Sequence, residues 1–219
     1  MEADTISKNG RSSKSQSSRV NIQTNVLQII FSMKVFFILA FTVSITSISA
    51  QTLSGNISSL KGKQEVNVEI DFSETLVNNE PEESYISLNT KEKNDEEKAE
   101  WLNEWREELP EEAYSQFIKY LNNEINQKGI TAGDFPNAEY TIHVKVINIS
   151  PGVSQWKNSN VSLNISFLKT GQTSPIATIE YKRTWANWSN IYAHHINRIC
   201  RAFDYVGMNL GKTISNNLK

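Results

Sequence analysis

A long, one-sided apolar helix pattern near the end of the chain restricts the choice of fold. The positions on this face follow helical spacing, and they are Ile191, Tyr192, His195, Ile196, Ile199, Phe203, Val206, Leu210 and Ile214. Ser189 or Asn190 can cap the start of this helix, and Gly207 and Gly211 permit close approach to a sheet. Because a wide apolar face is stable only when another layer covers it, we expect a helix-on-sheet architecture.

Four segments supply the strands of that sheet, since each alternates apolar and polar residues. They are residues 66–72, 140–149, 161–167 and 176–181, the last with room to extend to 184. The last three lie close together in sequence and predict an antiparallel meander. A change of face at Ile147 and Ile149 indicates either a bulge or an end of one-sided burial.

A second helical region follows the first strand. The polar residues 73–92 predict a long loop, which can include a short strand at residues 85–88. Carboxylates then crowd the first turn of a helix that begins at Asp95, as the helix dipole favours. Pro110 is followed by two glutamates, which suits the first turn of a helix, so one kinked helix and two abutting helices both fit. Gly129 ends the region.

These elements occur in the order β-α-β-β-β-α. The order predicts an α+β fold with a mostly antiparallel four-stranded sheet and two main helices packed on one face. The helical crossover after the first strand can place the first two strands parallel to each other.

Residues 33–50 have the features of a cleavable signal peptide. Lys34 precedes an apolar run, and small and hydroxyl residues follow it as far as Ala50. Cleavage after Ala50 or one residue earlier both fit. A membrane anchor is the alternative, but the uncharged run is shorter than the roughly 20 residues that span a bilayer. We therefore expect residues 1–32 to be disordered or to precede the true start at Met33, and residues 51–219 to form a single α+β domain.

Charge and cysteine content limit the partners and the compartment. Residues 51–219 contain 17 of the 22 basic residues and 22 of the 24 acidic residues, a net charge of −5. An acidic domain has no electrostatic footprint for nucleic acid or an anionic membrane surface. Cys200 is the single cysteine, which excludes an intramolecular disulfide. A signal peptide on a chain that can form no intramolecular disulfide favours a bacterial periplasmic or secreted protein. We expect this protein to be soluble after cleavage and not stably inserted in a membrane.

No pattern in the sequence predicts a catalytic residue, a cofactor or a metal site. The carboxylates of residues 92–112 alternate with basic residues and lack the ligand spacing of a calcium loop, so they predict a solvated helix face. Adjacent residues of a helix point about 100° apart, which favours His194 and His195 as core or boundary residues over metal ligands. Cys200 lies beside the apolar stripe and is predicted to be a buried, inert thiol.

One aromatic segment is the candidate ligand-binding site. Indole and phenol rings beside amides can hold sugars by stacking and hydrogen bonding, and the predicted residues are Trp156, Trp185, Asn187, Trp188 and Tyr192. The alternative is that these rings fill the open end of the core. The Asn-Xaa-Ser sequons matter only in a eukaryotic secretory pathway; they begin at Asn56, Asn148, Asn160, Asn164 and Asn187.

The chain resembles secreted proteins of Bacteroidetes with no assigned activity. The features that carry this resemblance are the signal, the strand at 66–72, the segment from Gly133 to Ile142 (GDFPNAEYTI) and the final amphipathic helix. The order of elements is also similar to the amino-terminal domain of TolB and related envelope lipoproteins. That resemblance implies an assembly or binding module and not an enzyme. The chain departs from the lipoproteins because no cysteine follows the signal, and no functional residue carries over.

Three functions follow from these observations, and the first is our expectation. It is a non-catalytic envelope module that binds a protein or glycan partner. The second is a small hydrolase whose site is assembled from residues distant in sequence, which a pocket with a hydrogen-bonded histidine and serine or aspartate would favour. The third is a structural or oligomerising envelope protein, which an exposed sheet edge or a large apolar patch would favour.

Overall fold

The computed structural model describes residues 51–152, 158–185 and 194–218. They belong to one compact unit, Gln51–Lys219. The unit contains a sheet and helices packed against it, which confirms the α+β class. The sheet has eight strands and mixed directions, so the prediction of a four-stranded, mostly antiparallel sheet is wrong.

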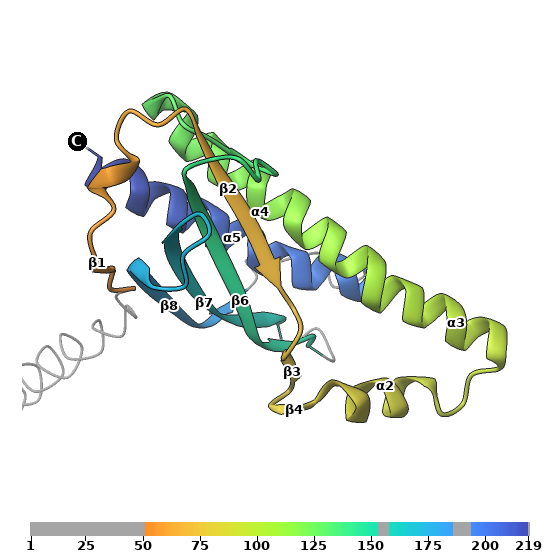
Figure 1. Ribbon diagram of the computed structural model, residues 1–219. Helices are drawn as coiled ribbons and strands as arrows, with labels where there is room; N and C mark the ends of the chain where they lie inside the picture. The colour runs from red at the N-terminus through yellow and green to blue at the C-terminus, as the bar shows by residue number, and fades with distance from the viewer. Residues whose placement is uncertain (1–50, 153–157, 186–193, 219) are drawn as a thin grey trace, which may run out of the picture. The chain divides into compact units, whose positions relative to one another are not determined.

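The four predicted strands form the long strands of the sheet (Figure 1). They are β2 (Glu65–Asp71), β6 (Tyr140–Ser150), β7 (Asn160–Lys169) and β8 (Pro175–Trp185). β6, β7 and β8 pair antiparallel in sequence order, which confirms the meander. β2 pairs parallel with β6, from Asn67 opposite Thr141 to Asp71 opposite Lys145. The crossover therefore places the first two long strands parallel.

Four short strands complete the sheet. β1 (Ser54–Gly55) pairs antiparallel with β8, and β5 (Thr131–Gly133) pairs parallel with β2. β3 (Leu76–Val77) pairs parallel with β6 and antiparallel with β4 (Glu80–Pro81). The sequence did not predict these strands because two or three residues are too few to show an alternating pattern.

The segment predicted as a loop with a short strand contains a helix instead, α2 (Glu82–Thr90). Pro81 precedes two glutamates here, the same Pro-Glu-Glu order as at residues 110–112. Proline with fixed φ and carboxylates near the helix N-terminus both favour a helix start. Thr90 is the one buried residue of this helix, so no apolar stripe marks it in the sequence.

The helical crossover is one long helix with a widened turn in its middle. α3 (Asp95–Asn103) starts at a capping box in which Asn94 and Glu97 exchange two 3.0 Å hydrogen bonds. A π-helical turn, η2 (Glu104–Glu108), leads into α4 (Leu109–Ile125) and a 3₁₀ turn, η3 (Asn126–Lys128). Pro110 has no N–H and would clash with a carbonyl one turn earlier in a regular α-helix, which explains the widened turn. Gly129 ends the region in the left-handed conformation, with φ of 74°.

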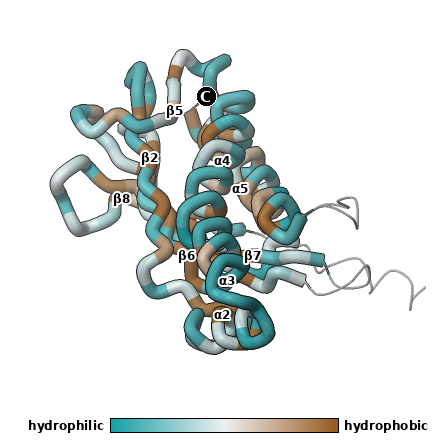
Figure 2. The backbone as a smooth tube through the Cα atoms, turned by 90° about the vertical axis from the view of Figure 1, so that its right-hand side faces the viewer, coloured by the Kyte–Doolittle hydropathy of each residue, from teal (hydrophilic) through white to brown (hydrophobic). Residues whose placement is uncertain are grey.

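Both main helices cover the same face of the sheet, as predicted. Figure 2 shows β2 and β8 on one side and α4 and α5 (His195–Asn217) on the other. The fully buried core between them includes Phe117, Leu121, Val144, Ile165, Tyr181, Phe203 and Leu210. Among the described helices, none combines the length and the apolar character needed to cross a membrane.

The two glycines of α5 serve a helix contact and not the sheet contact that the sequence predicted. A Cβ at Gly207 would lie 2.4 Å from the carbonyl oxygen of Phe117 in α4. A Cβ at Gly211 would lie 2.5 Å from the Cβ of Glu124 in the same helix. The absence of side chains at these positions therefore lets α4 and α5 approach closely.

Cys200 is a buried free thiol on α5, as predicted. Burial raises the pKa of this thiol to about 12, with smaller contributions from the nearby carboxylates of Glu112 and Asp204. The thiolate is the reactive form of cysteine, so this side chain contributes to packing and offers no nucleophile at neutral pH.

Candidate functional site

A cavity of about 310 Å³ opens where β6 ends, β7 begins and β8 ends. Its lining is polar with one aromatic ring, and consists of Asn78, Asn79, Asn148, Ser150, Gly152, Asn160, Ser162, Arg183 and Trp185. The cavity is therefore built from three adjacent strands and from the turn between β3 and β4.

Pairing between the strands explains how the lining residues meet. Ser150 of β6 lies opposite Asn160 of β7, which lies opposite Trp185 of β8. Asn148 and Ser162 form the next pair along β6 and β7. Residues two apart on a strand share a face, so two Asn-Xaa-Ser triplets on neighbouring strands direct four polar side chains to one face. The intervening residues of these triplets are buried core residues.

Two irregularities shape the strand ends beside the cavity. The β6–β7 register shifts between Val146 and Asn148, which confirms the predicted bulge at Ile147. A second shift lies between β7 and β8, where Arg183 has a φ of 48° and donates its backbone N–H to the Ser162 hydroxyl at 3.2 Å. Bulges bend a strand and redirect its side chains, and here they occur at the end of the sheet that carries the cavity.

The Asn78-Asn79 turn forms another wall. Both residues have positive φ, 56° and 66°, the combination that a two-residue type I′ hairpin requires and that asparagine tolerates. The Asn78 N–H donates to the carbonyl of Ile149 at 2.9 Å, and the Asn79 N–H donates to the Asn148 side-chain oxygen at 2.7 Å. These bonds hold the turn against the end of β6.

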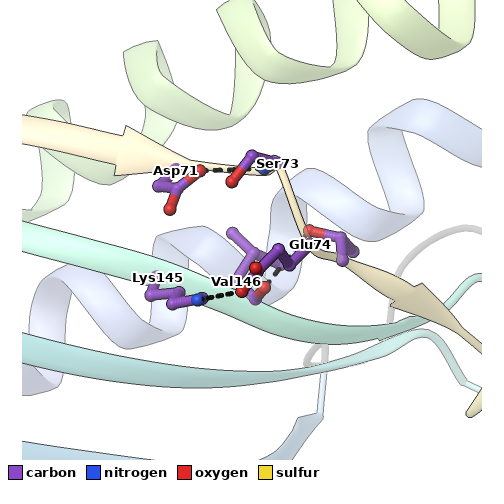
Figure 3. A network of polar contacts seen from close by, with 6 residues as sticks. Asp71, Ser73, Glu74, Lys145 and Val146 are labelled. Atoms are coloured by element: carbon purple, nitrogen blue, oxygen red, sulfur yellow. Dashed lines mark hydrogen bonds and ion pairs between the residues drawn. The ribbon is translucent and has the colours of Figure 1, made fainter.

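A network of polar contacts holds the segment between β2 and β3 against β6. This segment precedes the Asn78-Asn79 turn in the chain. Figure 3 shows the residues of the network, Asp71, Ser73, Glu74, Lys145 and Val146. The Lys145 ammonium pairs with the Glu74 carboxylate, and the Thr75 hydroxyl donates to the Val146 carbonyl at 3.2 Å. Hydrogen bonds from the side chain and backbone of Ser73 hold the pKa of the Asp71 carboxyl below its usual value. The segment thereby positions the Asn78-Asn79 turn.

The lining can bind a polar ligand but offers no acid–base pair. It presents four amides, two hydroxyls, one guanidinium and the indole of Trp185, which is 51% exposed. Asn148 and Asn160 are buried, so their positions are fixed by packing. Among the described lining residues there is no carboxylate, histidine or thiol, the groups that most often transfer protons or act as nucleophiles.

The structure places one of the five predicted site residues in this cavity, Trp185. Trp156, Asn187, Trp188 and Tyr192 lie outside the described residues. The other eight lining residues were not predicted as site residues. In the sequence, Asn148 and Asn160 stand out only as the first residues of sequons. The signal that could identify them as site residues is the recurrence of Asn-Xaa-Ser on two adjacent predicted strands.

Comparison with known proteins gives little similarity. No model of a known protein family matches the chain, and no curated protein matches it. The PelC dodecamer from Paraburkholderia phytofirmans is 8% identical, with 76% of this chain and 94% of that chain covered and a TM-score of 0.39. A single-substitution variant of that dodecamer is also 8% identical, with 70% and 92% covered and a TM-score of 0.31. Similarity at these TM-scores supports no conclusion about fold, assembly or function.

Proposed function

We propose that the chain is a non-catalytic module whose cavity binds part of a glycan. The observation that carries this proposal is the half-exposed indole of Trp185 beside the buried amides of Asn148 and Asn160. The apolar face of a sugar ring stacks on an indole, while its hydroxyls exchange hydrogen bonds with amides and serine hydroxyls. Both kinds of group line the same cavity here.

Arg183 adds a charge to this set. It is the one ionisable side chain among the described lining residues, and a guanidinium forms charge-assisted, bidentate hydrogen bonds with carboxylates. An acidic sugar would therefore gain an interaction that a neutral sugar lacks. The small-hydrolase alternative lacks support in this lining, because the two serines have no histidine or aspartate beside them among the described lining residues, and glycoside hydrolysis commonly needs a pair of carboxyl groups.

Replacing Trp185 with alanine is expected to weaken glycan binding by about tenfold or more, a loss of about 1.4 kcal/mol or more. The melting temperature should change little, because half of this side chain is exposed. A glycan array identifies the ligand of the purified protein, and calorimetry then compares the variants. Trp185→Phe should keep most of the affinity because it keeps an aromatic face.

Tyr205→Ala is the matched control, since Tyr205 is an exposed aromatic residue (37%) that does not line the cavity. Arg183→Gln should weaken binding of acidic oligosaccharides and leave neutral ones unaffected. The proposal would be refuted by a wild-type protein that binds no glycan, or by equal affinities for wild type and Trp185→Ala.

We also propose that this module acts in the periplasm or outside a bacterial cell, in keeping with the predicted leader, and that its kinship lies with the secreted Bacteroidetes proteins and TolB-like modules named above. Amino-terminal sequencing of the protein recovered from an expressing bacterium tests the leader. The sequence is expected to begin at Ala50 or Gln51. A protein that keeps residues 33–50 in the membrane fraction would contradict export with cleavage.

A further inference from the structure

Three side chains with metal-ligating groups meet at the start of α5. They are Glu104, His194 and His195, and one ligand atom of each lies within 4.8 Å of the other two. The Nε2 atom of His194 is 3.5 Å from the Glu104 carboxylate. None of these residues lines the cavity described above, so the cluster is a separate feature of the molecule.

The two histidines converge because they do not both lie within the helix. His194 is the N-cap residue, with extended backbone angles of −49° and 148°, and His195 is the first residue of α5. The 100° divergence that the sequence predicted applies only between two helical residues. The ring centroids of the two histidines are 4.3 Å apart. The two imidazoles can therefore approach one ion together at this helix start.

The widened turn of the crossover places the third ligand. Glu104 is the first residue of the π-helical turn η2, and single π turns within α-helices occur frequently at functional sites. The Glu104 side chain is 24% exposed and that of His194 is 48% exposed. Solvent therefore reaches both of these side chains.

Aromatic packing fixes the orientation of His195. Its ring is nearly parallel to those of Trp101 and Trp105, at centroid distances of 6.1 Å and 6.4 Å. The Nε2 atom of His195 is buried and has no hydrogen-bond partner among the described residues. Buried polar atoms usually have a partner, and the Nε2 atom of His195 therefore has a lone pair or proton that none of the described residues binds.

We propose that Glu104, His194 and His195 bind a zinc ion. Two imidazoles and a carboxylate form a ligand set that zinc prefers, and three protein ligands leave one position of its tetrahedron open to solvent. Calcium and magnesium prefer oxygen ligands and should bind poorly. With bonds of about 2.0–2.2 Å the ligand atoms of a tetrahedral site lie about 3.3 Å apart, so zinc draws together side chains that are already neighbours. This proposal does not depend on the glycan proposal.

Titration of the chelator-treated, purified protein with zinc chloride tests the site. Calorimetry is expected to show one zinc ion bound per chain, and zinc should raise the melting temperature because it binds the folded state. Cobalt(II) should give the visible absorption of a tetrahedral site with nitrogen and oxygen ligands. Calcium chloride should give no binding heat and should not raise the melting temperature.

Variants assign the ligands. Glu104→Gln and His194→Ala should each weaken zinc binding at least tenfold, since both side chains are partly exposed and their loss should not disturb the core. His195→Phe keeps a ring against the two tryptophans and removes the ligand, so it should also lose binding. His143→Ala is the matched control: His143 is the third histidine of the chain, lies on β6 and should be dispensable.

The proposal is overturned if the wild-type protein binds no zinc, or if Glu104→Gln and His194→Ala bind it as tightly as the wild type. Loss of binding in His143→Ala would place the ion elsewhere. Equal affinity for calcium would contradict a site that depends on imidazole nitrogen.

Discussion

Replacing Gly207 with alanine is expected to lower the free energy of unfolding by about 3 kcal/mol. The new Cβ would lie 2.4 Å from the carbonyl oxygen of Phe117, 3.2 Å from its carbonyl carbon and 3.3 Å from the backbone nitrogen of Leu121. These are backbone atoms of α4, so no side chain can rotate to make room and the two helices must separate. In an exposed helix the same change stabilises the protein by up to about 1 kcal/mol. A loss of stability, and not a gain, would therefore indicate that α4 and α5 are in close contact at this position.

Urea denaturation followed by circular dichroism measures this change. Asn216→Ala is the matched control, because Asn216 is exposed on the same helix and surface substitutions usually change stability by less than about 0.5 kcal/mol. A Gly207→Ala variant as stable as the wild type would show that α4 and α5 are farther apart than described.

Replacing Trp105 with alanine is expected to destabilise the protein by about 4 kcal/mol. The Trp105 ring is 3% exposed and lies 4.9 Å from the ring of Tyr85 and 5.7 Å from that of Trp101. Its indole N–H also donates to the Glu82 carboxylate at 2.6 Å. The side chain therefore joins α2 to the π-helical turn, and its loss leaves both a void and an unpaired acceptor.

Trp105→Phe separates these two contributions, since it keeps an aromatic ring and removes the indole N–H. It should cost about 1–2 kcal/mol. In the Trp105 variants, hydrogen exchange should show a larger loss of protection for the amides of α2 than for those of β6 and β7. Trp185→Ala serves as the tryptophan control, and a Trp105→Ala variant no less stable than Trp185→Ala would contradict the packing described for α2.

The elements with one buried face could be predicted from the sequence, and the others could not. β2, β6, β7, β8 and α5 bury alternate or helically spaced residues, so hydrophobic periodicity identifies them. β1, β3, β4 and β5 are held by their neighbours in the sheet and contain too few residues to show a period. The helix at Glu82–Thr90 has almost no buried face, and only its Pro-Glu-Glu start could have indicated it.

The residues of the candidate sites could likewise be predicted only where a local pattern in the sequence marks them. Trp185 could be proposed because the sequence places it close to other aromatic residues and to amides, the groups that bind sugars. Asn78 and Asn79 could be identified as turn residues, but their place beside Asn148 depends on the pairing of β3 with β6, which no local pattern encodes. For His194 and His195, helical spacing predicts side chains that diverge. Their convergence depends on the exact residue at which α5 starts, and helix boundaries are the least predictable feature of a sequence.

The position of α5 in the chain also determines when the core can close during synthesis. Twelve of its 23 residues are buried, yet the ribosome makes this helix after every other described element. Until it emerges, α4 and the sheet expose the surface that α5 covers, and domains generally fold as units. The core of this domain therefore cannot close before α5 has been synthesised. An open chain is the form that a secretion channel can thread, so a late core helix suits the export proposed above.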